Sequence, residues 1–190
     1  EISGGRFYFG VGVSHAPAMN RLGVRQGKPL TDMRNFVKEL RGVQRVGDLP
    51  PLVLATLRTK MIALAEEIGD QFSIAMTTVQ RARILDDQGK FEEALPCFDR
   101  AIAVFEDLGA RWELGDATAE RGIAKRELGR LDEAEEDLRR AIRISEELGE
   151  RQLASWTWRA LAKVSERRGD KAEAEQRLRR SREAEARGPR

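Results

Sequence analysis

Apolar side chains recur every three or four residues over most of the chain after residue 70, and glycines interrupt this pattern at regular intervals. The glycines form two series with the same period of 40 residues: Gly69, Gly109 and Gly149, and Gly89, Gly129 and Gly169. A spacing of three to four is that of a helix with one buried face, and glycine often ends a helix. Each period therefore predicts two helices. The predicted helices span residues 72–87, 91–108, 112–127, 131–148, 152–167 and 171–185.

The turn between the two helices of a period is followed by a small residue that recurs with the period. Ala94, Ala134 and Ala174 allow close helix approach, and Phe98, Leu138 and Leu178 would fill the groove between helices. The motif Gly89-Lys90-Phe91-Glu92-Glu93-Ala94 and the residues after it resemble the tetratricopeptide repeat. The resemblance implies a mainly α fold for residues 71–190, a superhelix of three helical hairpins that binds proteins or peptides.

The period is longer than the roughly 34 residues usual in that family. It is similar to longer repeats attached to bacterial regulatory ATPases, cyclases and transcription regulators, which implies a bacterial regulatory protein. In the last repeat, Lys171 and Ser181 stand where the other repeats have apolar or small residues. This change predicts a terminal capping unit with a polar outer face.

Residues 1–70 carry a different pattern. The apolar run from Arg6 to Val13 predicts a strand buried on both faces, and a helix with an apolar stripe is predicted from Pro29 to Gly42. The run at 50–55 predicts either a short strand or the start of a further repeat. Under either interpretation residues 57–68 form a helix, and we expect it to cap the amino-terminal end of the repeats.

Four motifs in residues 2–70 resemble, in order, the middle of luciferase-like monooxygenases and oxidoreductases that use F420 or a flavin. They are Gly4-Gly5-Arg6-Phe7-Tyr8-Phe9-Gly10-Val11-Gly12-Val13-Ser14-His15; Lys28-Pro29-Leu30 with Met33-Arg34; Pro50-Pro51-Leu52-Val53-Leu54-Ala55 with Leu57-Arg58-Thr59-Lys60-Met61; and Ala65-Glu66-Glu67-Ile68-Gly69-Asp70. The resemblance implies a small α/β fragment of a (β/α)₈ barrel. Two strands cannot close such a barrel.

The same resemblance implies a set of cofactor-binding residues for F420 or FMN: Gly12, Ser14 and His15 beside the ring, and Thr56, Arg58 and Lys60 near a phosphate. The amino terminus of a helix suits an anion. A solvated loop and a solvated helix face would explain the same residues without any cofactor.

The concave side of a repeat array is lined mainly by its first helices, and these predict a partner-binding surface. The candidates are Thr77, Gln80, Arg81, Arg121, Lys125, Trp158 and Lys163. Arginine and tryptophan are enriched among binding hot spots, and several cations would suit an acidic or carboxylate-ended peptide. The alternative for Trp112, Trp156 and Trp158 is packing between helices.

The amino-acid composition indicates which kinds of partner to expect. The formal net charge of +2 gives no strong field for nucleic acid or a membrane, and arginines in the last helix alternate with glutamates. The single cysteine, Cys97, cannot form an internal disulfide, and no apolar run approaches a membrane span. We therefore expect a cytoplasmic protein, and the absence of an initial methionine suggests a fragment of a longer chain.

The repeats contain no paired carboxylates, metal-ligand cluster or nucleophile with a base. The sequence thus predicts a non-catalytic scaffold for protein–protein interaction, with no catalytic or metal-binding residue. The alternative is a luciferase-like oxidoreductase dependent on F420 or flavin, or its inactive remnant.

Overall fold

The computed structural model describes residues 9–11, 29–42, 52–54, 65–67 and 69–186. The chain divides into two compact units, residues 1–77 and 78–190, and each is described by itself.

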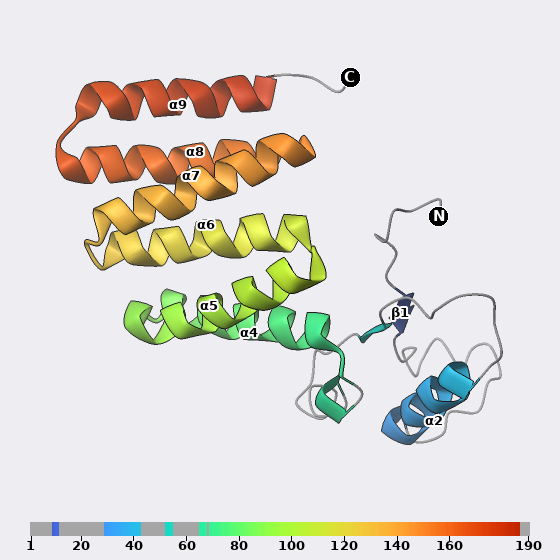
Figure 1. Cartoon of the computed structure of the whole chain (residues 1–190). Coiled ribbons are helices and arrows are strands. Elements are labelled where there is room, and N and C mark those ends of the chain that lie inside the picture. Colours follow the sequence, from blue (N-terminus) through green and yellow to red (C-terminus); the bar gives the residue numbers. More distant parts are fainter. Residues whose placement is uncertain (1–8, 12–28, 43–51, 55–64, 68, 187–190) are drawn as a thin grey trace, which may run out of the picture. The chain divides into compact units, whose positions relative to one another are not determined.

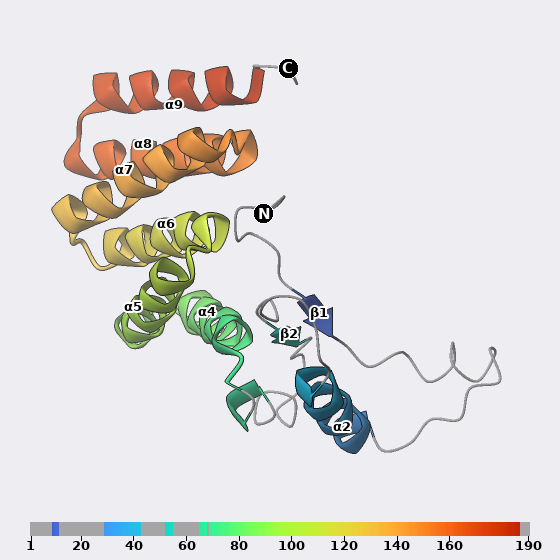
Figure 2. The ribbon, with the colours of Figure 1, turned by 45° about the vertical axis from the view of Figure 1, so that its right-hand side comes forward.

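Six long helices follow one another toward the carboxyl terminus (Figure 1): α4 (Gln71–Asp87), α5 (Phe91–Leu108), α6 (Arg111–Glu127), α7 (Leu131–Leu148), α8 (Arg151–Arg168) and α9 (Lys171–Ala186). Their bounds confirm the helices predicted from the periodicity. From α5 onward each helix packs on the next, and α6 also contacts α8. Figure 2 shows α6 to α9 stacked one above another.

Glycines in a left-handed conformation end the helices where the sequence predicted turns. Gly109 and Gly149 have φ of +64° and +71°, values that residues with a Cβ adopt only at a cost. In the first of these turns the N–H of Ala110 donates to the carbonyl of Phe105 at 2.9 Å, which satisfies a carbonyl at the helix end. Asp70 makes the equivalent bond to Ala65 after the helical residues 65–67.

Small residues lie where the helices come closest. Ala94 and Ala134 are fully buried, and Ala174 is 3% exposed, as the sequence predicted. Phe98 and Leu138 are also fully buried. The core of the array is therefore a continuous layer between neighbouring helices, as in other stacked repeats.

The last described helix, α9, has a polar exposed face, as predicted, but its role as a terminal capping unit stays a prediction. Lys171, Glu175 and Arg182 are exposed on α9, whereas Ser181 is buried and shares a hydrogen bond of 2.9 Å with Ser155. The exposed side of α9 is therefore polar, and the buried Ser181 contributes to the contact with α8.

In the first unit, the described strands β1 (Phe9–Val11) and β2 (Leu52–Leu54) pair in parallel, with Phe9 opposite Leu52. Helix α2 (Pro29–Gly42) lies between them in sequence. Met33 and Val37 are buried on α2. Arg34 donates two hydrogen bonds to Glu67, each 2.6 Å long, and so links α2 to residues 65–67.

Candidate partner-binding surface

Ion pairs align the first helices of the three hairpins side by side. Arg83 on α4 donates to Asp116 at 2.5 Å and to Glu120 at 3.2 Å, both on α6. Arg167 on α8 donates to the side chain of Glu127 on α6 and, at 2.6 Å, to the carbonyl of Arg126. We call the face of α4, α6 and α8 that carries these side chains the first-helix surface.

Carboxylates predominate where α4 and α6 meet. Burial raises the pKa of Asp116 and of Glu120, and Arg83 only partly opposes this. Burial also raises the pKa of Asp86, and the charges of Asp87 and Glu127 add to the effect. The buried Oδ1 of Asp86 accepts no hydrogen bond from the described residues. This end of the first-helix surface therefore disfavours further negative charge.

Two of the predicted partner-binding cations, Arg121 and Lys125, are brought together by one buried carboxylate. Asp137 on α7 is 4% exposed and accepts hydrogen bonds of 2.8 and 2.6 Å from Arg121 and an ion pair of 2.9 Å from Lys125. Arg121 also donates to Asp99 on α5 at 2.7 Å. Although burial opposes its charge, Asp137 and Asp99 raise the pKa of Arg121. These cations hold three helices of the array together.

The remaining predicted residues are on α4 and α8. Thr77 is half-buried and its hydroxyl donates to the carbonyl of Ser73 at 2.9 Å, while Gln80 and Arg81 are exposed on α4. Trp158 is half-buried and packs against the core. Lys163 is exposed on α8. The role of these residues in binding a partner stays a prediction.

The predicted cofactor-binding residues, Gly12, Ser14, His15, Thr56, Arg58 and Lys60, lie outside the described residues. The described part of the chain holds no group of three or more side chains suited to a metal ion. Every helix within it is too short or too polar to cross a bilayer.

A stripe along α8 contains the predicted candidate Lys163 and two arginines, Arg159 and Arg167, that were not predicted. Trp156, Arg159, Lys163 and Arg167 follow one another at spacings of three, four and four residues, which places them on one side of the helix. We call these four residues the α8 stripe. Trp156 is partly buried against the core, and the three cations are exposed. The helical spacing alone was a sufficient signal for this group.

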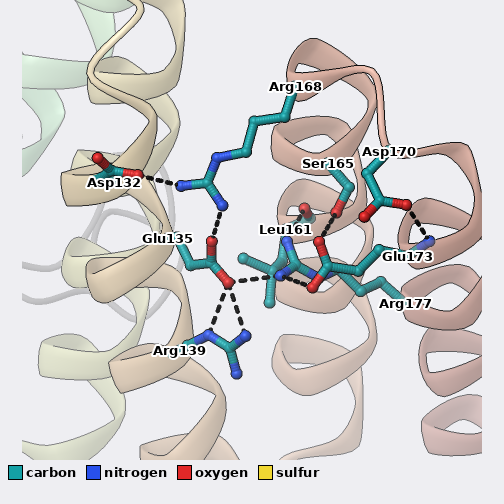
Figure 3. A network of polar contacts seen from close by, with 9 residues as sticks. All are labelled: Asp132, Glu135, Arg139, Leu161, Ser165, Arg168, Asp170, Glu173 and Arg177. Carbon is teal, nitrogen blue, oxygen red and sulfur yellow. Dashed lines mark hydrogen bonds and ion pairs between the residues drawn. The ribbon is translucent and has the colours of Figure 1, made fainter.

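A second buried network joins α7, α8 and α9 (Figure 3). Arg177 is 4% exposed and donates to Glu135 at 2.5 Å, to Glu173 at 2.6 Å and to the carbonyl of Leu161 at 3.1 Å. Glu135 also pairs with Arg139 and Arg168. Each of these charged side chains is paired with an opposite charge inside the network. The network therefore serves to connect α7, α8 and α9.

The carboxylate at the centre of this network stays ionised. Although burial raises the pKa of Glu135, hydrogen bonds from Arg139 and Arg168 and the charge of Arg177 lower it to about 2. A proton-transfer role at neutral pH is therefore disfavoured for Glu135.

Comparison with known families agrees with the geometry. Two family models, each described as a tetratricopeptide repeat, match residues 79–148 and 114–184. No curated protein shows significant similarity to the chain. The two matches overlap on α6 and α7 and together run from α4 into α9. The two matches together support a tetratricopeptide repeat array over residues 79–184.

Proposed function

We propose that residues 71–190 are a non-catalytic scaffold of a bacterial regulatory protein and bind a segment of another protein on the first-helix surface. The observation that carries the proposal is the alignment of α4, α6 and α8 by Arg83 and Arg167. It sets three helices side by side and leaves charged side chains and a partly buried tryptophan along them. Aromatic and arginine side chains of this kind favour protein binding. Tetratricopeptide repeats need no cofactor for this role.

Peptide selection followed by site-specific cross-linking tests the proposal. Peptides selected from a random library against the whole chain would be cross-linked by a photoreactive amino acid placed at Lys163 on α8 or at Arg143 on α7. Both positions are exposed and basic, which makes the two variants a matched pair. We expect cross-links from position 163 and few from position 143. Efficient cross-linking from position 143 alone would contradict the assignment of the surface.

A second candidate function is that of an F420- or flavin-dependent oxidoreductase. The parallel pairing of β1 with β2, with α2 between them in sequence, favours an α/β unit of the kind that the luciferase-like resemblance implies. Gel filtration of the protein mixed with F420 or FMN tests it by absorbance. Stoichiometric retention of either compound would support this candidate, and its absence would exclude tight binding.

A further inference from the structure

Two large apolar side chains are exposed where α6 begins and α7 ends. Trp112 is 44% exposed and Leu148 is 41% exposed. Arg111 on α6 donates a hydrogen bond to Glu147 on α7, so the two helix ends lie side by side, and Trp112 and Leu148 are each the next residue in sequence. We call these two side chains the anchor patch. Exposed apolar side chains that gather in one place mark interaction sites more often than scattered ones do.

The start of α8 lies at the same end of the array. A Cβ at Gly115 on α6 would be 3.0 Å from Cγ2 of Ile144 on α7 and 3.3 Å from Cδ2 of Leu153 on α8. The three helices therefore meet within one turn of Trp112. The turn from α7 to α8 contains Glu150, which is exposed and forms no ion pair within the described part of the chain.

Carboxylates follow Trp112 along the same side of α6. Asp116 is four residues after Trp112 and Glu120 is four residues further, a spacing that keeps side chains on one side of a helix. Both carboxylates pair with one cation, Arg83. The charge of Asp86 also acts on Glu120, and its buried Oδ1 accepts no hydrogen bond from the described residues. This side of α6 therefore carries more negative charge than Arg83 neutralises.

The neighbouring helix ends add further negative charge. Glu113 follows Trp112 and Glu150 precedes α8, whereas the cation at this turn, Arg151, is half-buried. The last turn of α7 contains no basic residue, which leaves Glu146 at the negative end of the helix dipole. Departures of this kind from local rules are found mainly at functional sites. A partner that brings cations to this end of the array would offset the unfavourable charge.

We propose that the anchor patch and the carboxylates beside it are the docking site for a basic segment of a partner protein. A large apolar side chain of the segment packs on Trp112 and Leu148, and its lysines or arginines pair with Glu150 and with the carboxylates of α6. The exposed indole also attracts a cation placed over its ring. The inference rests on the proposed function, because Trp112 shares a side of α6 with Asp116 and so adjoins the first-helix surface. It adds the chemistry of the partner.

The geometry of α6 sets the spacing within the segment. From residue 112 to residue 120 a helix rises about 12 Å, at 1.5 Å per residue. An extended chain covers this distance with about four residues at roughly 3.3 Å each. A segment with one large apolar residue and a basic residue at every second position beside it therefore fits the site.

The test uses the full chain and a fluorescent peptide of about ten residues, with a central leucine, lysine at every second position and serine elsewhere. One control peptide has glutamate in place of lysine, and another has serine in place of leucine. We expect the lysine peptide to bind and to weaken as salt is added. Each control should bind at least about tenfold more weakly. Equal binding with and without leucine would show attraction to charge alone and would overturn the proposal.

Two matched truncations test the anchor patch. Trp112→Ala should weaken binding of the lysine peptide by at least about tenfold. Phe36→Ala, which removes an aromatic side chain of similar exposure, 43%, from α2, should alter binding by less than about twofold. Circular dichroism would establish that both variants fold. Similar losses in the two variants would contradict the assignment.

Two matched charge reversals test the carboxylates. Glu150→Lys should weaken binding about tenfold. Glu166→Lys makes the same change at an exposed position near the other end of α8, about 24 Å away at 1.5 Å per residue, and should alter binding by less than about twofold. Equal losses would mean that only the net charge of the chain matters, and the proposal would be wrong.

Sedimentation of the chain alone over a range of concentrations tests a second copy as the occupant. Self-association that Trp112→Ala abolishes, without binding of the lysine peptide, would assign the anchor patch to contact between copies and would overturn the proposal.

Failure of this inference is distinguishable from failure of the proposed function. If the lysine peptide does not bind while library-selected peptides still cross-link from position 163, the surface binds proteins and its assignment to a basic segment is wrong. If the lysine peptide binds as expected while selected peptides cross-link only from position 143, the anchor patch is supported and the assignment of the first-helix surface fails.

Discussion

At the scale of single residues, Gly122 is where α6 and α7 leave least room. A Cβ at this position would lie 2.9 Å from Cγ of Leu138 and 3.2 Å from the carbonyl oxygen of Ala134. Leu138 is fully buried, so it has little space to move away. The close approach of the two helices therefore requires glycine here.

Gly122→Ala tests this packing. Alanine favours a helix over glycine by about 1 kcal/mol, but the overlap with Leu138 should cost about 1–3 kcal/mol. We expect a net fall in the free energy of unfolding, measured by urea titration. A gain of about 1 kcal/mol would show that the helices separate without cost.

The lowered pKa of Glu135 predicts a dependence of stability on pH. The group titrates near 4.5 ordinarily and near 2 in the folded chain. A depressed pKa stabilises the folded state fully above the ordinary value, and this contribution is lost as pH falls from about 4.5 toward about 2.

Glu135→Gln should therefore lower the free energy of unfolding by about 2 kcal/mol at pH 7. The difference from the parent chain should shrink as the pH falls below 4.5, the ordinary pKa of this carboxyl. Urea titrations at a series of pH values measure both quantities. Glu136→Gln, at an exposed neighbouring position, is the control. A difference that stays constant with pH would contradict the role of the charge.

At the scale of helices and hairpins, one repeat position shows why the three repeats are not interchangeable. Cys97, Asp137 and Arg177 are 40 residues apart. Asp137 and Arg177 are equally buried and carry opposite charges. Asp137 is matched by Arg121 and Lys125, and Arg177 by glutamates. A hairpin in the wrong place would bury an unmatched charge, which is strongly unfavourable.

Asp137→Ala should destabilise the array more than Glu147→Ala, although both remove an acidic partner of an arginine on α6. Asp137 is buried and its loss leaves Arg121 and Lys125 poorly matched, so about 3 kcal/mol is expected. The pair of Glu147 with Arg111 is exposed on both sides, so less than about 0.5 kcal/mol is expected. Thermal or urea unfolding compares the two. Similar effects would show that Asp137 contributes no more than a surface charge.

At the scale of the whole molecule, the array becomes more polar toward its carboxyl-terminal end. The described buried residues of α9 are Ala174, Arg177 and Ser181, whereas α8 buries nine residues, among them Leu161 and Val164. Because stability in a stack is a sum of contacts between neighbours, the terminal helix should open most easily.

Hydrogen exchange followed by mass spectrometry tests this order. Amides of α9 should exchange at least about tenfold faster than those of α6 and α7, since local opening needs less free energy where fewer apolar side chains are buried. Uniform protection across the described helices would indicate a single cooperative unit.

Much of the array was predictable because its determinants are local. Gly109 and Gly149 marked helix ends, and Ala94 and Ala134 marked close contacts, from their spacing alone. The capping helix predicted at residues 57–68 stays a prediction, since only 65–67 of it are described, and so does the cofactor site. The sequence does not show which cations are paired inside the fold. Arg121 lies on a predicted helix, as an exposed arginine can, and its partner Asp137 is 16 residues away.

The sequence by itself determined the helices, their ends and the hairpin repeat, since periodic apolar positions and glycines act within one or two helical turns. Only the tertiary structure decided which charges are free. Asp137 lies 16 residues from Arg121 and Glu135 lies 42 residues from Arg177. The stacking of distant helices decides whether a cation is neutralised inside the protein, as Arg121 is, or left exposed, as Lys163 is.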